Sequence, residues 1–385
     1  MATTIPEQRR EACRRLTRIM REHQPFSFLR LGDGELLFML NVQRGLANGP
    51  PALHASCEIA YDGPGIDNRH YERLRRSYEE CTFLDYHDSI PFNIESLPKL
   101  DLQRRENLFR NESADTSLLI YDWTFHEFHD FIRGRRCLFA GAEASLLREL
   151  FSDPRYRELA SAFWPEDAAP IFHQVRENGA NLSNNLDLIK GDLAALIQEH
   201  QIDTLFLCLG GAAKVICHEL SQELKIRAID WGSMMRGLAY CGSAGAALWR
   251  ASHNPFFVRI PFAMHMDALE RAHPEMPPAT LLAKAHAQLC LDLQRKETMN
   301  SFAADVIDPS SFDAGEENLR LFSEGRAVYE ARYRPLARRD PAAEKLVQEF
   351  DYWCLKKGLG WRGKFFQLLV RGRQTARRVA GLSPA

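Results

Sequence analysis

The sequence lacks a long apolar run, closely paired cysteines and a secretion signal. No run of about 18 apolar residues is present, which excludes an ordinary membrane-spanning helix. The start of the chain has no apolar stretch behind its basic residues, so we expect a cytoplasmic location. The nine cysteines are scattered without a CxxC pair, which argues against a zinc or redox motif and favours reduced, mostly buried thiols.

The sequence also lacks an excess of one charge over most of its length. Its formal net charge is -2. A protein that follows a phosphate backbone generally needs a basic face or domain, so we expect no nucleic-acid partner. Charged residues make up 26% and hydrophobic residues 45% of the chain, as in an ordinary globular protein. Only the C-terminus departs from this balance, because residues 352–385 contain no acid.

The order of apolar segments and turns predicts an α/β core with additions at both ends. Capping and helical spacing indicate an N-terminal helix within residues 1–24, and strands alternate with helices over residues 25–245. A charged, turn-rich stretch at about 51–112 interrupts this alternation and is expected to be an inserted or helical elaboration over one edge of the sheet. Residues 246–350 are expected to be a mostly helical accessory region, and residues 351–385 a basic amphipathic tail.

The predicted core repeats one unit, in which an apolar strand ends at a turn and a helix follows. The strands are expected at residues 26–31, 116–122, 136–143, 204–211 and 226–230. Such alternation is typical of a Rossmann-like, doubly wound, mostly parallel sheet. The apolar repeat that starts at two prolines, residues 277–296, predicts a helix in the additional C-terminal region. Ligands of such sheets bind at the carboxyl ends of the strands, so the loops there hold the candidate site residues.

The first predicted strand ends in an acidic turn with two glycines, RLGDGEL. Asp33 and Glu35 are two residues apart, so both carboxylates can point the same way and bind Mn²⁺ or Mg²⁺. Gly32 and Gly34 allow the backbone to approach a phosphate closely, and Arg30 stands beside them in the sequence. The alternative is a plain turn before a helix, whose dipole the first-turn acid complements.

Two later strands end in loops of small residues that open onto helices. One loop contains Glu143 and Ser145, and the other contains Gly210, Gly211 and Lys214. Such loops expose backbone N–H groups at a helix N-terminus, which suits phosphate, and Lys214 adds a cation. Neither loop is a complete GxGxxG or P-loop motif, and ordinary strand-to-helix turns stay the alternative.

Two further groups of polar residues are candidates for chemistry. Asp230 ends the last predicted strand, where an acid serves as a general base, as an acceptor for a ribose or sugar hydroxyl, or as a helix cap. His126 and His129 are three residues apart, with Asp130 adjacent, and could bind a metal. Because a third ligand at a defined distance is missing, we assign the two histidines no role.

Taken together, these segments resemble the GT-D-fold glycosyltransferases, a family first recognised as a domain of unknown function and linked to sugar addition on serine-rich bacterial adhesins. The resemblance covers about residues 25–240 and is carried by RLGDGEL, the Gly-Ala-Glu-Ala-Ser loop and LGGAAKVICHELSQELKIRAIDWGS. It implies that Asp33 and Glu35 hold the metal and the donor diphosphate. The residues that it implies for the donor pocket are Arg30, Gly32, Glu143, Ser145, Lys214 and Asp230.

The chain departs from that family in two places. Gly210-Gly211-Ala212-Ala213 stands where the family usually has a loop closer to Gly-Pro-Thr-Ala, and Ser233 stands where it has a histidine. These departures leave the base and sugar preference of the donor pocket open. The residues beyond the core show no match, which leaves the acceptor open.

The sequence therefore predicts a metal-dependent enzyme that transfers a sugar from a nucleotide-sugar donor to a glycan, lipid-linked or protein acceptor. We expect Asp230 or Glu143 to contact the sugar or to act as base on the acceptor hydroxyl. Two alternatives remain. One is a Rossmann-type enzyme that uses another nucleotide or an S-adenosyl cofactor, and the other is a nonenzymatic factor that retains the fold.

The C-terminal tail mixes basic, aromatic and aliphatic residues. Its bases are Lys356, Lys357, Arg362, Lys364, Arg371, Arg373, Arg377 and Arg378. This mixture is typical of interfacial segments and predicts attachment to an anionic membrane, at the inner face of the plasma membrane. The alternative is a helix that docks its apolar side on the protein while its cations stay in water. Four glycines, at 358, 360, 363 and 372, weaken a long continuous helix.

Overall fold

The structure is a computed structural model, and the helices and strands lie in two compact units. It describes residues 7–31, 39, 68–85, 109–110, 119–175, 182–232, 234–239, 258, 260–294 and 314–379. The first unit comprises residues 1–241, 253–260 and 296–313. The second comprises residues 242–252, 261–295 and 314–385.

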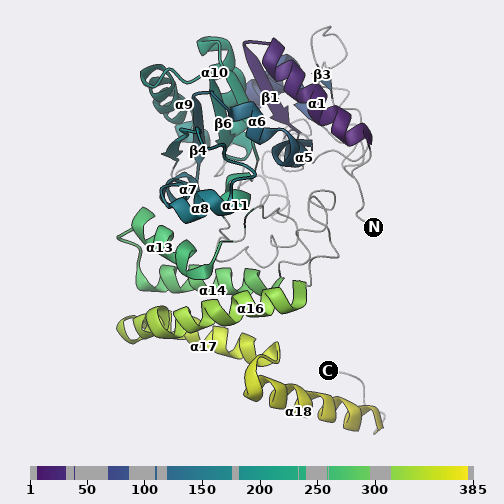
Figure 1. The fold of residues 1–385 in the computed structure, drawn as a ribbon, viewed down its shortest axis with the longest axis vertical. Helices are drawn as coiled ribbons and strands as arrows, with labels where there is room; N and C mark the ends of the chain where they lie inside the picture. The colour runs from purple at the N-terminus through teal and green to yellow at the C-terminus, as the bar shows by residue number, and fades with distance from the viewer. Residues whose placement is uncertain are drawn as a thin grey trace. The chain divides into compact units, whose positions relative to one another are not determined.

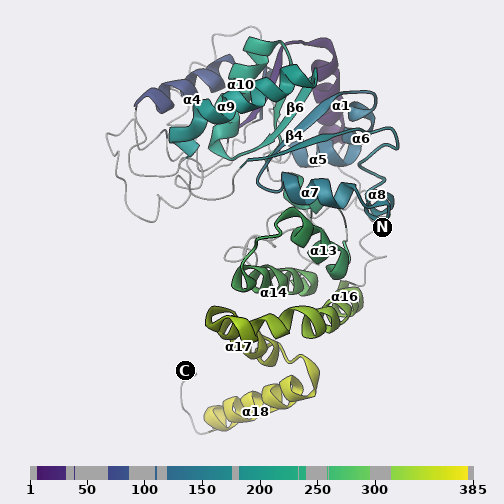
Figure 2. The ribbon, with the colours of Figure 1, turned by 90° about the vertical axis from the view of Figure 1, so that its left-hand side faces the viewer.

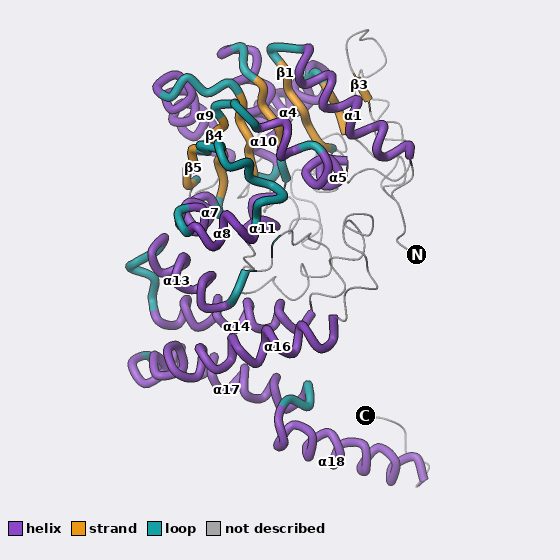
Figure 3. The backbone as a smooth tube through the Cα atoms, in the orientation of Figure 1, coloured by secondary structure: helices purple, strands orange, loops and turns teal. Residues whose placement is uncertain are grey.

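The first unit is built on a seven-stranded sheet, drawn as orange segments in Figure 3. Its strands are β1 (Phe26–Arg30), β2 (Phe83–Asp85), β3 (Phe109–Arg110), β4 (Cys137–Gly141), β5 (Ile171–Gln174), β6 (Thr204–Cys208) and β7 (Arg227–Asp230). Their order across the sheet is β3-β2-β1-β7-β6-β4-β5, and every neighbouring pair is parallel. The predicted α/β architecture with a parallel sheet is confirmed.

Helices cover both faces of this sheet, as Figure 2 shows. One face carries α4 (Asn68–Glu80), α9 (Leu182–Glu199) and α10 (Gly211–Leu224). The other carries α1 (Glu7–Glu22), α5 (Leu119–His126) and α6 (Phe128–Ile132). Three short helices follow the carboxyl ends of strands, namely α7 (Ala144–Phe151) and α8 (Pro154–Leu159) after β4 and α11 (Met234–Ala239) after β7 (Figure 1). The arrangement is doubly wound, as predicted.

The two faces of the sheet have different cores because successive strand side chains point to opposite faces. Leu138 and Leu205 belong to an aliphatic core with α9 and α10. Phe139 and Phe206 belong to an aromatic core, in which their rings stack with centroids 4.8 Å apart. Both faces of β4 and β6 are therefore buried, which explains why these strands read as continuous apolar runs.

One prediction about the first unit is wrong. Residues 119–122 were expected in a strand at 116–122, but they begin the helix α5, where the Thr124 hydroxyl donates to the carbonyl oxygen of Ile120. Buried side chains such as Trp123 on this helix produce an apolar run, and such a run alone does not distinguish a strand from a helix. The stretch at 51–112, expected as an inserted or helical elaboration over one edge, contains α4 and the strands β2 and β3, which extend the sheet at the edge beside β1.

The described residues of the second unit form helices joined by short turns. Its elements are α13 (Phe262–Ala272), α14 (Pro278–Gln294), α16 (Ala314–Val328), the π-helix η3 (Tyr329–Tyr333), the 3-10 helix η4 (Arg334–Arg339), α17 (Pro341–Lys356) and α18 (Gly360–Val379). Helices α13, α14 and α16 meet at Gly325, where a Cβ atom would lie 2.8 Å from both Leu289 and Phe262. The predicted helical C-terminal region is confirmed, with α14 at the proline-started repeat. None of the helices in the described ranges combines the length and hydropathy that a membrane span needs.

Candidate functional site at the carboxyl ends of the strands

The connections between strands define a switch point in the sheet. From β4 the chain continues to β5 on one side, and from β6 it continues to β7 on the other side. Gly141 at the end of β4 is paired with Cys208 at the end of β6, so both strands end at the same level. Ligands of parallel α/β sheets bind in the crevice that such diverging connections leave. The predicted loop residues after β4 and β6 flank this point.

Helix α10 starts at the switch point and carries a buried ion pair. Its N-cap is Gly210, whose φ of 54° favours glycine. Lys214 Nζ lies 3.0 Å from Asp230 Oδ2 at the end of β7 and 3.1 Å from the carbonyl oxygen of Gly210. The two charged side chains are 6% and 0% exposed. The other oxygen of Asp230 accepts a hydrogen bond of 3.2 Å from the Gly232 N–H, so Asp230 holds both Lys214 and the turn after β7.

The loop after β4 is held by contacts with two other segments. Arg236 of α11 donates from Nε and Nη2 to Glu143 Oε1, at 2.9 and 2.7 Å. The side chains of Glu143 and Arg236 are 8% and 18% exposed. Gln174, at the end of β5, accepts from the Ser145 N–H at 2.9 Å and donates to the Ala142 carbonyl oxygen at 2.6 Å. Glu143 and Ser145 are therefore fixed at the switch point.

Arg30 brings a third cation to this edge of the sheet. It ends β1 in register with Asp85 of β2, a residue only 1% exposed. A Cβ atom at Gly232 would lie 1.9 Å from Arg30 Nη1, and the φ of Gly232 is +59°. Only glycine leaves room for the guanidinium group there. Arg30 thus reaches from the end of β1 across the turn that follows Asp230.

The buried thiols at this edge are unsuited to nucleophilic chemistry. Burial raises the pKa of Cys208, at the end of β6, and the charges of Glu143 and Asp230 raise it further. Burial and the charge of Asp230 likewise raise the pKa of Cys217 in α10. Because the thiolate is the reactive form, both cysteines are inert near neutral pH.

The predicted metal ligands cannot be placed beside these residues, because Gly32, Asp33, Gly34 and Glu35 lie outside the described ranges. β1 ends at Arg30, so this turn follows the strand directly in sequence. Among the described residues, no group of three or more His, Cys, Asp or Glu could hold a metal ion. Asp33 and Glu35 carry carboxylate oxygens, which are the ligands that Mg²⁺ and Mn²⁺ prefer. Their role as ligands stays a prediction.

Sequence reasoning missed three polar residues of the site, Arg236, Gln174 and Asp85. Arg236 lies in the first turn of the helix after β7, and a cation at that place was the one available signal. Gln174 and Asp85 end the strands β5 and β2, which were not predicted. A prediction of these two strands would have marked both residues as polar side chains at strand ends, and so as candidates for the site.

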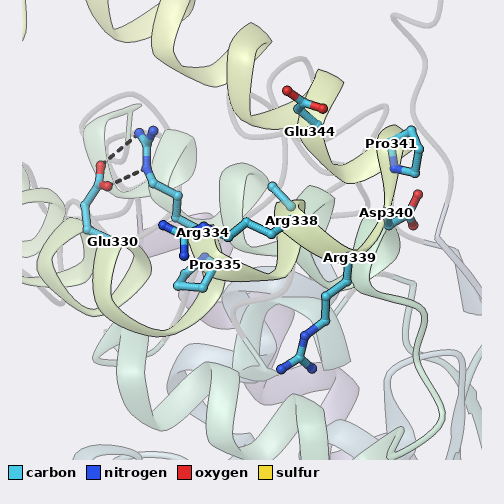
Figure 4. Close-up of a pocket in the computed structure, with 9 residues that line it drawn as sticks. Glu330, Arg334, Pro335, Arg338, Arg339, Asp340, Pro341 and Glu344 are labelled. Atoms are coloured by element: carbon cyan, nitrogen blue, oxygen red, sulfur yellow. Dashed lines mark hydrogen bonds and ion pairs between the residues drawn. The ribbon is translucent and has the colours of Figure 1, made fainter.

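The second unit has a cavity of about 670 Å³ beside η4 and the start of α17 (Figure 4). Its charged lining residues are Glu330, Arg334, Arg338, Arg339, Asp340 and Glu344. Arg334 also forms an ion pair with Asp351, and Figure 4 shows it turned toward Glu330. Cations and acids are thus mixed along this cavity, and it favours no particular class of ligand.

A buried polar contact lies between α14 and the π-helix of the same unit. His286 Nε2 is 2.7 Å from the Tyr329 hydroxyl oxygen, and its ring stacks on Phe350 with centroids 4.4 Å apart. Burial lowers the pKa of His286 to about 4, so the ring is neutral at pH 7. A neutral imidazole stacked between helices is a packing element rather than a general acid.

The chain was compared with family models, with curated proteins and with solved structures, and none of them matched. The fold described above therefore rests on this structure alone, and a function has to be argued from the residues gathered at the carboxyl ends of the strands.

Proposed function

We propose that this protein is a metal-dependent glycosyltransferase that binds a nucleoside-diphosphate sugar at the carboxyl ends of β1, β4, β6 and β7. The observation that supports it is the gathering of Arg30, Lys214 and Arg236 at this edge, each from a different element. Arginine and lysine side chains bind the negatively charged oxygens of a diphosphate. The backbone N–H groups at the N-terminus of α10 can donate hydrogen bonds to the same oxygens. The neighbouring carboxylates suit sugar hydroxyls.

The described residues differ in what they do in this proposal. Asp230 is a positioning residue, because its two oxygens bind Lys214 and the Gly232 N–H and its side chain is fully buried. Both hydrogen bonds from Arg236 go to Oε1 of Glu143. We therefore assign Oε2 of Glu143 to a sugar or acceptor hydroxyl. Of the two acids expected to contact the sugar or to act as base, these contacts favour Glu143 over Asp230.

The transfer itself needs one bond to form and one to break. The acceptor oxygen bonds to the anomeric carbon, the bond from that carbon to the diphosphate breaks, and the acceptor proton passes to the general base. A divalent cation held by Asp33 and Glu35 would offset the charge of the departing nucleoside diphosphate. Arg30 and Lys214 add fixed positive charge at the same edge.

We also infer a cytoplasmic location, where the buried free thiols such as Cys137 and Cys208 stay reduced.

A panel of nucleotide sugars tests this proposal. Thermal unfolding and nucleotide release are measured for the purified protein with each sugar nucleotide, in Mn²⁺ and in EDTA. We expect at least one donor to raise the melting temperature and to release nucleotide only when the cation is present. Stabilisation by an S-adenosyl compound or a dinucleotide in EDTA, with no response to any nucleotide sugar, would overturn it.

The same assay identifies the metal ligands. Asp33→Asn and Glu35→Gln should each lower nucleotide release by roughly 10²-fold, because each removes a ligand of the ion that stabilises the leaving group. Glu199→Gln is the matched control, since this acid is 69% exposed. It ends α9, just before the amino end of β6, whereas the proposed site lies at the carboxyl ends of the strands. Near-normal rates in both folded acid variants would reject the role of the acidic turn.

A further inference from the structure

Helix α18 leaves a row of large apolar side chains in solvent. Trp361, Phe365, Leu368 and Leu369 are 74%, 58%, 64% and 52% exposed. Their spacing of four, three and one residues puts them on one side of the helix. We call these four residues the α18 stripe. Solitary exposed apolar residues are ordinary on a protein surface, whereas four large ones in a row need an explanation.

The opposite side of α18 contacts α17, so the exposure of the stripe follows from how the helix packs. Gly363 is buried, and a Cβ atom there would lie 2.6 Å from the backbone carbon of Gly358. Gln367 donates from its side-chain amide to the carbonyl oxygen of Lys356. Gly358 and Gly360, with φ of +74° and +71°, make the turn that directs α18 this way. The alternative of docking the most apolar side on the protein is not the arrangement found.

Basic side chains accompany the stripe. Arg362, Lys364 and Arg371 are exposed. At about 100° per residue, Arg362 lies on one flank of the stripe, and Lys364 and Arg371 lie on the other. Arg362 also covers the Trp361 ring, with its guanidinium carbon 5.3 Å from the ring centroid. No Asp or Glu occurs in the sequence after Asp351.

We propose that α18 binds the surface of an anionic membrane, with the stripe in the interfacial layer and the flanking bases on lipid phosphates. Charge complementarity selects this partner, because an apolar row between two basic flanks is the pattern of helices that lie in a bilayer interface. Nucleic-acid binding would use the bases but not four exposed apolar side chains, and self-association would bring like charges together. The proposal goes beyond the proposed enzyme function and holds whatever reaction the first unit catalyses.

Sedimentation of the full chain with vesicles tests this binding. Vesicles of neutral phosphatidylcholine are compared with vesicles containing about one third phosphatidylglycerol, at low salt. We expect the protein to pellet with the anionic vesicles and to stay in the supernatant with the neutral ones. Each of Arg362→Gln, Lys364→Gln and Arg371→Gln should weaken binding about fivefold, because a base near an anionic leaflet contributes about that factor.

The apolar part of the proposal has its own matched control. Leu368→Ser should weaken vesicle binding about tenfold or more, since it removes a buried aliphatic side chain from the bound state. Leu319→Ser, at a leucine of α16 that is 50% exposed, should leave binding unchanged. Equal pelleting of the wild type and the Leu368→Ser variant would overturn the proposal, as would equal pelleting with neutral vesicles. Failure of the wild type to pellet, with a concentration-dependent dimer in light scattering, would overturn it in favour of self-association.

Discussion

Helix α10 carries two clusters of ion pairs between acids and bases, and the two clusters differ in how far their side chains are exposed to solvent. At its first turn, Lys214 pairs with Asp230, and the side chains are 6% and 0% exposed. On its outer side, Glu219 pairs with Arg73 at 2.8 Å and with Lys190 at 2.9 Å, and these side chains are 19% to 21% exposed. The first cluster lies at strand ends, whereas the second joins α10 to α4 and α9.

We interpret the difference as one between a proposed ligand site and a structural contact. A partly exposed network joins three helices at small cost, because water still reaches its charges. A fully buried pair carries a large desolvation cost, and well-packed apolar residues would often be as stable in its place. We interpret the cation at the switch point as retained for binding, because this is the place where parallel sheets bind their ligands. Arg236 with Glu143 repeats the arrangement on the other side of the switch point.

The largest effect is expected from breaking the buried pair. Asp230→Asn removes the negative charge and leaves Lys214 buried and unpaired, so the free energy of unfolding should fall by about 3–5 kcal/mol. Asparagine retains an oxygen for the Gly232 N–H, so the loss reports on the charge pair. Urea unfolding followed by circular dichroism measures it.

The double variant Lys214→Met with Asp230→Asn sharpens this result. With no charge left in the pair, the double variant should be clearly more stable than Asp230→Asn alone. If both variants lose the same free energy, the cost does not come from an unpaired lysine.

A smaller, pH-dependent effect is expected from the outer cluster. Glu219→Gln should cost on the order of 1–2 kcal/mol at pH 7. Burial alone would raise the pKa of Glu219, but hydrogen bonds and charges from Arg73 and Lys190 outweigh it and lower the pKa below the ordinary value of 4.5. A carboxylate with a lowered folded-state pKa stabilises the fold above its unfolded pKa, and that contribution disappears as the pH falls through the folded value.

The difference in stability between the wild type and Glu219→Gln should therefore be full at pH 7 and should shrink below about pH 4.5. Unfolding curves in urea from pH 7 to pH 3 measure this difference. A difference that is constant over the whole range would show that the Glu219 charge does not stabilise the contact.

How far the fold could be predicted depended on burial and length. Strands β1, β4 and β6 are buried, mainly apolar segments that end at a recognisable turn, so their pattern was sufficient. The strand β2 has only three residues, too few for a pattern. Helix α5 was taken for a strand because Leu119, Ile120 and Trp123 are all buried, which removes the polar side that marks a surface helix.

The site was predictable as a set of loops but not as a set of contacts. Small residues and charges at strand ends marked Glu143, Lys214 and Asp230. The partner of Glu143 is 93 residues away in sequence, and Gln174 is 29 residues from the Ser145 amide that it accepts from. Such pairs depend on the order of strands in the sheet, which the sequence pattern leaves open.

The most direct test of the central claim compares nucleotide binding by a variant of the ion pair beside the switch point with a variant of the outer cluster of α10. Arg236→Gln and Arg73→Gln each neutralise one arginine in an ion pair with a glutamate. Calorimetric titration uses the sugar nucleotide with the largest thermal shift, in Mn²⁺, at a temperature where both variants are folded. The account predicts a Kd at least about tenfold higher in Arg236→Gln, and an unchanged Kd in Arg73→Gln. Equal Kd values in the wild type and Arg236→Gln, or a loss confined to Arg73→Gln, would contradict it.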